Sequence, residues 1–140
     1  MTTNQACELF IDGASRGNPG PASVGCVLRS KNSTRHFSKY LGETTNNAAE
    51  YLALIYGLQE ALKEKCDTIT VKTDSELLAR QINGQYKVRD QQLRLFFDLA
   101  CHMIARFKHF EVSHIPREQN TEADKLAGDA VRRQSASRVL

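Results

Sequence analysis

The chain has 140 residues, of which 41% are hydrophobic and 25% are charged, and its formal net charge is +3 at pH 7. These totals fit one globular domain with its own core and exclude a fibrous, disordered or strongly basic protein, so they permit a nucleic-acid partner without indicating one. The longest apolar run, YLALIYGL, is too short to span a membrane and the N-terminus MTTNQACELF lacks signal-peptide features, so we expect a cytoplasmic protein without a membrane partner.

The first part of the chain is predicted to form three strands and a helix. Apolar and β-branched residues indicate strands at 7–12, 23–30 and 34–41. A loop rich in Gly, Ser, Asn and Pro, GASRGNPGP, separates the first two strands, and a short polar turn separates the second from the third. An apolar helix follows, which begins at Asn46 or Asn47 and ends near Glu64.

The second part alternates strands and helices. The predicted elements are a strand at 68–73, a short helix at 75–82, a long helix at 90–107, a strand at 109–115 and a helix from Thr121 to about Arg132. We expect one domain over residues 1–133 and a frayed tail over 134–140. The order predicts an α/β fold in which strands 1 to 3 form an antiparallel meander, while strands 4 and 5 run parallel to strand 1.

The four cysteines, at positions 7, 26, 66 and 101, are widely scattered. They form no CxxC pair and show no zinc-binding spacing with the four histidines. Disulfide bonds are uncommon in cytosolic proteins. We therefore expect reduced, mostly buried thiols.

The predicted topology brings four acidic residues to one edge of the sheet. Asp12 ends the first strand and Asp74 ends the fourth, and these two strands run in the same direction. Glu50 and Asp124 lie in the first turns of two helices that begin at that edge. This is the edge at which open α/β sheets usually bind ligands.

Each acid taken alone has an ordinary structural explanation. Asp12 precedes a glycine and can belong to a turn, and Asp74 precedes a helix and can cap it. Glu50 and Asp124 each follow a capping residue by three positions, as in a capping box. The four acids become informative only as a group.

Four carboxylates that meet at one edge repel one another unless some are protonated or hard cations lie between them. Mg²⁺ suits an all-oxygen ligand set and commonly shares a substrate phosphate. Two such ions about 4 Å apart can clamp a phosphodiester for in-line attack by water. Asp12, from its central position, is the natural bridging ligand. The Gly-rich loop has neither GK[ST] nor GxGxxG spacing, so no small-molecule cofactor is indicated.

Four motifs carry these acids in order: DGASRGNPGPASVG (12–25), TTNNAAEY (44–51), TDSELL (73–78) and IPREQNTEADKLA (115–127). With them the chain resembles a type 1 ribonuclease H over about residues 7–132. The resemblance implies a ribonuclease H-like fold, a mixed five-stranded sheet flanked by helices. It also implies an endoribonuclease that hydrolyses the RNA strand of RNA/DNA hybrids with two Mg²⁺ ions, or with Mn²⁺ as a substitute, and leaves 5′-phosphate and 3′-hydroxyl ends. The family's metal-binding acids fall on Asp12, Glu50, Asp74 and Asp124.

The resemblance further implies contacts with the hybrid. The corresponding positions are Gly13, Ala14, Ser15, Asn18, Thr45, Asn46 and Asn47. The first four would approach the RNA strand, and Thr45 would contact a DNA phosphate. Asn46 and Asn47 would reach the minor groove, because an amide can bind a 2′-hydroxyl and a base edge together. Helix capping is the alternative role for these two amides.

The chain departs from many bacterial members of the family at two places. Residues 83–89, NGQYKVR, replace a basic, Trp-containing protrusion, and we expect no hybrid-binding domain before the first strand. Asp90 stands where many members have an Asn near a DNA phosphate, which removes the expectation of that contact. We therefore expect a compact, monomeric form with weak hybrid affinity and low processivity.

Two residues compete for the role of the family's mobile auxiliary residue, which is often a His before the last acid. His114 has a suitable spacing to Asp124 but lies in a predicted strand. Arg117 lies in the loop that follows Pro116, from which it can contact the scissile phosphate or help products leave. We favour Arg117, with His114 as a structural residue at the strand end.

Two other functions stay open at the level of sequence. A non-catalytic module that binds hybrids or duplexes can share this fold, although four uncompensated carboxylates repel phosphate. A related nuclease that also cuts double-stranded RNA or RNA–DNA junctions would carry the same motifs. The sequence does not separate these substrates, and it does not give the preferred metal.

Overall fold

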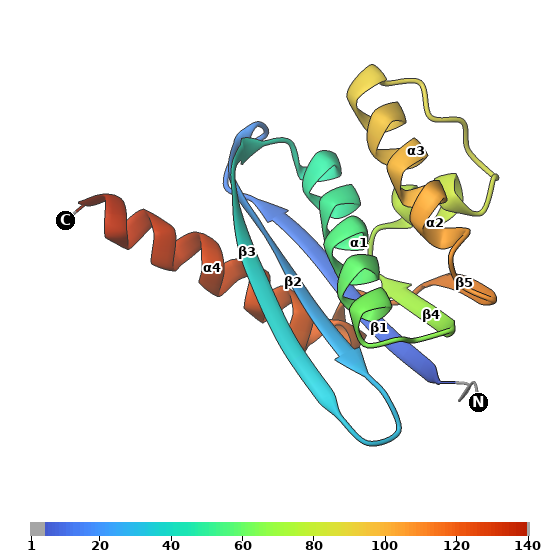
Figure 1. Cartoon of the computed structure of the whole chain (residues 1–140). Coiled ribbons are helices and arrows are strands. Elements are labelled where there is room, and N and C mark those ends of the chain that lie inside the picture. Colours follow the sequence, from blue (N-terminus) through green and yellow to red (C-terminus); the bar gives the residue numbers. More distant parts are fainter. Residues whose placement is uncertain (1–4, 140) are drawn as a thin grey trace.

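Figure 1 shows the computed structural model, which describes residues 5–139 and the side chains of residues 5–134. The strands are β1 (Ala6–Ser15), β2 (Gly20–Arg29), β3 (Thr34–Thr44), β4 (Thr68–Thr73) and β5 (His109–His114). The helices are α1 (Asn46–Lys63), α2 (Glu76–Ile82), α3 (Gln91–Ile104), the 3-10 turn η1 (Arg117–Gln119) and α4 (Thr121–Val139). None of the helices in residues 5–139 is long and apolar enough to cross a membrane.

The five strands form one mixed sheet in the order β3-β2-β1-β4-β5. β1, β2 and β3 pair as an antiparallel meander. β4 pairs parallel to β1, and β5 pairs parallel to β4. The predicted α/β class and strand directions are therefore confirmed.

Helices cover both faces of this sheet. α1 packs on β1 and β2 on one face, and α3 packs on α1. α4 crosses β2, β1 and β3 on the opposite face, as Figure 1 shows. Leu9, Ile11 and Val71 from the strands and Leu54 and Leu58 from α1 are fully buried. Burial of this apolar surface is the main source of stability.

β1 and β2 are longer than the sequence predicted. Their antiparallel ladder continues to the pair Ser15–Ala22, so only residues 16–19 connect the two strands. Asp12 therefore lies inside β1 rather than at its end. The parallel ladder between β1 and β4 stops at the pair Ile11–Thr73. Asp12 thus follows the last paired residue, where β1 extends past the end of β4.

α4 also continues past the predicted helix end near Arg132. It runs to Val139, through the segment that was expected to fray. No Gly or Pro interrupts residues 129–139, so nothing in this part of the sequence forces the helix to stop.

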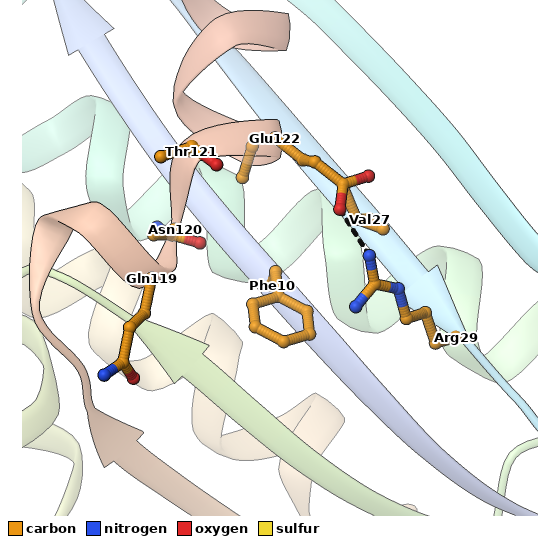
Figure 2. Close-up of a pocket in the computed structure, with 8 residues that line it drawn as sticks. Phe10, Val27, Arg29, Gln119, Asn120, Thr121 and Glu122 are labelled. Carbon is orange, nitrogen blue, oxygen red and sulfur yellow. Dashed lines mark hydrogen bonds and ion pairs between the residues drawn. The ribbon is translucent and has the colours of Figure 1, made fainter.

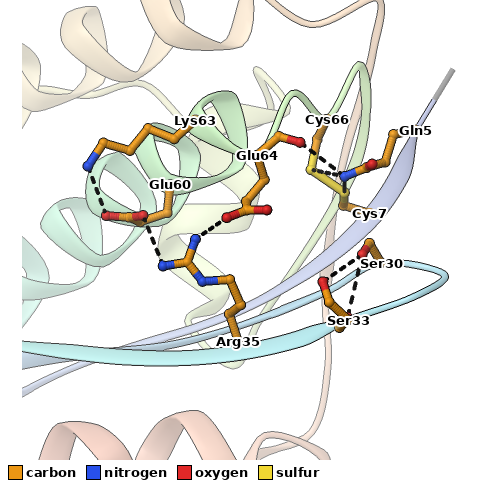
Figure 3. Close-up of polar contacts among 9 residues, drawn as sticks. All are labelled: Gln5, Cys7, Ser30, Ser33, Arg35, Glu60, Lys63, Glu64 and Cys66. Carbon is orange, nitrogen blue, oxygen red and sulfur yellow. Dashed lines mark hydrogen bonds and ion pairs between the residues drawn. A yellow bond between two sulfur atoms is a disulfide. The ribbon is translucent and has the colours of Figure 1, made fainter. Parts of the chain in front are cut away.

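One expectation about the cysteines is wrong. Cys7 and Cys66 form a disulfide bond, with their Cα atoms 6.1 Å apart (Figure 3). The two residues are 59 positions apart in sequence. They meet because the crossover through α1 returns the chain beside the start of β1, where Gln5 bonds the backbone of Thr68. Cys26 and Cys101 are free thiols.

Candidate active site

Three acidic side chains meet where the β1–β4 ladder ends. Asp12 lies in β1, Asp74 directly follows β4, and Glu50 lies in the first turns of α1. One carboxylate oxygen from each of the three lies within 4.8 Å of the others. Asp124, from the first turn of α4, lines the same cavity of about 480 Å³. The structure therefore brings the four predicted acids to one place.

Glu50 is not part of a capping box. Thr45 caps α1 instead, because its hydroxyl accepts a hydrogen bond from the N–H of Ala48 at 3.1 Å. Glu50 Oε1 accepts from the backbone N–H of Gly13 at 2.8 Å. A Cβ atom on Gly13 would lie 2.2 Å from the carbonyl carbon of Ala49, so only glycine allows α1 to approach β1 this closely.

Asp74 is not a helix cap either. The cap of α2 is Ser75, whose hydroxyl accepts from the N–H of Leu78 at 3.2 Å. The carboxylate of Asp74 is therefore not used to cap the helix, and Asp74 lines the cavity. At the start of α4, Asp124 donates its backbone N–H to the carbonyl of Asn120 at 3.1 Å, and its carboxylate accepts from Arg117 at 3.3 Å.

Burial and mutual repulsion shift the pKa values of two of the acids. Asp12 is 5% exposed, and burial together with the charges of Glu50 and Asp74 raises its pKa to about 9. Burial raises the pKa of Glu50 to about 8, although the hydrogen bond from Gly13 lowers it. Both shifts favour the protonated form of these carboxyl groups when no cation is bound. A close, all-oxygen donor set of this kind fits a hard divalent cation such as Mg²⁺.

The two candidate auxiliary residues have different positions. Arg117 lines the acidic cavity and contacts the carboxylate of Asp124, and its side chain is 78% exposed. His114 is the last residue of β5, paired with Thr73, and its side chain is exposed. His114 is not among the residues that line the acidic cavity. The geometry therefore puts Arg117, rather than His114, beside the acids.

Four of the seven residues predicted to contact a nucleic acid line the same cavity. Gly13, Ala14, Ser15 and Asn46 line it. The side-chain oxygen of Asn18 accepts from the backbone N–H of Asn46 at 3.0 Å, which joins the β1–β2 connection to the start of α1. Asn47 is exposed on the first turn of α1.

Sequence reasoning missed three residues at the start of α2 and one residue before α4. Ser75, Glu76 and Leu77 also line the cavity. The cap preference of Ser75, directly after a strand, is a signal that could have placed it there. Asn120 is 1% exposed beneath the site, and a polar residue before a helix gives no sign of such burial.

Comparison with known proteins shows the family. The family model described as "Reverse transcriptase-like" matches residues 10–130. Ribonuclease H of Enterobacter sp. is 32% identical over 134 residues, which cover 86% of this chain and 85% of that protein. Ribonuclease HI of Halobacterium salinarum is 40% identical over 126 residues and 89% of this chain, which spans 63% of that protein. The chain spans 35% of the bifunctional protein Rv2228c of Mycobacterium tuberculosis, at 37% identity over 126 residues.

Solved structures agree with these matches. The N-terminal RNase H domain of Rv2228c superposes with a TM-score of 0.92 at 34% identity, covering 96% of this chain and 99% of that one. RNase H1 from Halobacterium salinarum gives a TM-score of 0.88 at 38% identity, with coverages of 91% and 98%. LC11-RNase H1, solved in complex with an RNA/DNA hybrid, gives 0.85 at 38% identity, with the same coverages of 91% and 98%.

The sheet order, the acid cluster and the family match define a protein of the reverse transcriptase-like class with a ribonuclease H fold. Within this class, the chain belongs to the type 1 ribonuclease H family. Residues 83–90, which connect α2 to α3, form a short connection without a Trp-containing protrusion.

Proposed function

We propose that this chain is an endoribonuclease that hydrolyses the RNA strand of RNA/DNA hybrids. The observation that carries the proposal is the convergence of Asp12, Glu50 and Asp74 on one point, with Asp124 lining the same cavity. The relative that was solved with an RNA/DNA hybrid supports the substrate, because this chain has the same fold over 91% of its length.

The four acids are proposed to hold two Mg²⁺ ions, or Mn²⁺ in their place. Such ions would supply Lewis-acid activation of water and neutralisation of charge at the scissile phosphodiester, and hydrolysis would leave 5′-phosphate and 3′-hydroxyl ends. Glu50 keeps its orientation through the bond from Gly13, which leaves its second oxygen for a cation. Because Asp12 and Glu50 are buried, few water molecules would compete with their carboxylates for the cations.

Residues around the acids are proposed to place the hybrid. The backbone of residues 13–15 and the side chain of Asn18 would lie along the RNA strand. Asn46 and Asn47 would bind the minor groove, where the 2′-hydroxyl distinguishes RNA from DNA. Thr45 is half-buried, and the exposed part of this residue would contact a DNA phosphate. Arg117, which already contacts Asp124, would reach the scissile phosphate.

The test is cleavage of end-labelled RNA/DNA hybrid, double-stranded RNA and double-stranded DNA, each with Mg²⁺, Mn²⁺ or EDTA. We expect cleavage of the hybrid's RNA strand with either metal and none in EDTA. Asp12→Asn removes a central ligand, so its turnover should fall by more than about 100-fold while the circular dichroism spectrum stays that of wild type. Retained cleavage by this variant would refute the assignment.

A binding module without catalysis predicts a different result. Such a protein would hold the hybrid equally well in EDTA, and more tightly after acid-to-amide substitutions. The convergence of four acids on one cavity argues against it, because carboxylates beneath a bound nucleic acid repel its phosphates unless cations lie between them.

A further inference from the structure

Asn120 lies buried beneath the acid cluster, between η1 and α4. Its side chain is 1% exposed, although the residues before it, from Pro116 to Gln119, are exposed. Its amide nitrogen Nδ2 donates to the carbonyl oxygen of Ile11 at 2.8 Å. Ile11 is the last residue that β1 pairs with β4, and it directly precedes Asp12.

The backbone of Asn120 reaches two other residues of the site. Its N–H donates to the carbonyl of Arg117 at 2.9 Å, and its carbonyl accepts from the N–H of Asp124 at 3.1 Å. One residue thus joins the strand that carries Asp12, the turn that carries Arg117 and the helical turn that carries Asp124. Within the described residues, the other side-chain contact between this turn and the acids is the exposed one of Arg117 with Asp124.

The two polar atoms of the Asn120 amide differ in their hydrogen bonding, and the side-chain nitrogen makes the bond described above. The side-chain oxygen is buried and has no hydrogen-bond partner among the described residues. Asn120 lines a small cavity of about 90 Å³, which Figure 2 shows between Phe10 of β1 and the first turn of α4. An unpaired buried acceptor is destabilising, so the structure keeps this amide for its Nδ2 donor.

Other side chains of similar size do not meet this requirement. An Asp would place a carboxylate oxygen against the carbonyl of Ile11 and add a negative charge beneath four acids. A Leu would leave that carbonyl unpaired in an apolar site. A neutral donor of short reach is required at this position.

We propose that Asn120 is a positioning residue for the acid cluster. Its bond to Ile11 fixes the first turn of α4, and with it Asp124 and Arg117, at the distance from Asp12 at which the four acids share divalent cations. This role rests on the proposed function, because it concerns the geometry of the same metal site. Asn120 is buried and is not among the residues that line the acidic cavity.

The test compares Asn120→Ala with a matched control, Ser23→Ala. The hydroxyl of Ser23 is fully buried and donates to the carbonyl of Ala127, so it also ties α4 to the sheet, but it lies outside the acidic cavity. Both variants lose one buried hydrogen bond to the sheet, from the residue directly before α4 in one case and from α4 itself in the other. A loss of stability alone should therefore affect them alike.

Three quantities are measured for each variant: the melting temperature in EDTA, Mg²⁺ affinity by calorimetry without substrate, and the Mg²⁺ dependence of hybrid cleavage. We expect both variants to melt at lower temperature. Asn120→Ala should bind Mg²⁺ about 10- to 100-fold more weakly, as for other residues that hold metal ligands in place. Ser23→Ala should bind Mg²⁺ like wild type. If Asn120→Ala does not fold, Asn120→Ser is measured in its place, because its hydroxyl lies one covalent bond closer to the backbone than Nδ2 and falls short of the Ile11 carbonyl.

Equal Mg²⁺ affinities for wild type and the Asn120 variant would overturn the positioning role and leave Asn120 as a structural residue. Equal losses in both variants would also overturn it, because the effect would then belong to α4 as a whole. A wild-type chain that binds Mg²⁺ but does not cut hybrid would refute the proposed nuclease, and the calorimetric comparison would still decide the role of Asn120. A wild-type chain that binds no Mg²⁺ overturns both.

Discussion

Glu50 shows at the scale of single residues how a helix-terminal acid becomes part of a site. Thr45 satisfies the free N–H groups at the start of α1, so the carboxylate of Glu50 is not needed there. Gly13 lets the strand approach the helix and donates to one oxygen of Glu50. Because a carboxylate has two oxygens, this bond orients the side chain and leaves the second oxygen for a cation.

The two candidate auxiliary residues, Arg117 and His114, can be compared directly by substitution. We expect Arg117→Ala to lower the turnover of hybrid by roughly 10- to 100-fold, because it removes the only cation that contacts the acids in the described residues, where charge builds up during phosphoryl transfer. His114→Ala should leave turnover close to wild type. Both side chains are exposed, so neither variant should change the melting temperature much.

Steady-state cleavage assays at saturating Mg²⁺ measure this difference. A larger loss of turnover for His114→Ala than for Arg117→Ala would contradict the preference for Arg117.

β1 shows at the scale of elements how one strand serves two separate purposes. Its first half carries Cys7, which is bonded to Cys66 beyond the end of α1. Its second half extends past β4 and carries Asp12 into the cavity. Around the disulfide, the side-chain amide of Gln5 donates to the carbonyl of Glu64, so the covalent link and the hydrogen bonds hold the same connection (Figure 3). The disulfide bond therefore lies at the start of β1, and the acid that lines the cavity lies in its second half.

Removing the disulfide should therefore lower stability and spare activity. In the chain-entropy model a link between residues 59 positions apart contributes about 4 kcal/mol. For the double variant Cys7→Ser, Cys66→Ser we expect a melting temperature lower by roughly 10 °C, with unchanged turnover at a temperature where the chain is folded. Calorimetry and cleavage assays measure the two effects.

Cys101→Ser is the matched control, since Cys101 is a half-buried free thiol. A double variant with the same melting temperature as the control would contradict a stabilising role for the disulfide bond.

The whole molecule couples its acid cluster to global stability. Folding buries Asp12 and Glu50 together, so their pKa values rise from 3.8 and 4.5 to about 9 and about 8. A folded chain that binds these protons more tightly than the unfolded chain is stabilised at low pH. It loses that stabilisation as pH rises through the folded pKa values. Divalent cations would replace the protons and restore stability at high pH.

The pH dependence of unfolding tests this coupling. In EDTA, we expect the free energy of unfolding of wild type to fall as pH rises from about 5 to 9, by about 1.4 kcal/mol per pH unit for each retained proton. Asp12→Asn removes one such group and should give a flatter profile. Mg²⁺ should raise the melting temperature of wild type at pH 8 more than that of Asp12→Asn. Equal slopes for the two chains in EDTA would contradict the raised pKa of Asp12.

By itself, the sequence determined the order of elements, the direction of the strands and the four acids at one edge. The order of elements follows from local periodicity and turn residues, which act over short stretches of chain. The strand directions and the shared edge of the acids follow from the hairpin connections and from the fixed hand of parallel crossovers, which hold whatever the side chains are. The monomeric state and cytoplasmic location stay predictions.

Only the tertiary structure decided the features that depend on residues far apart in sequence. Because the β1–β2 ladder continues to the pair Ser15–Ala22, part of the segment that was predicted to be a loop belongs to the two strands. The crossover brought Cys7 to Cys66, and the docking of α4 buried Asn120 against Ile11. A side chain's partners across 59 or 109 positions are set by how whole elements pack, and no local pattern encodes that packing.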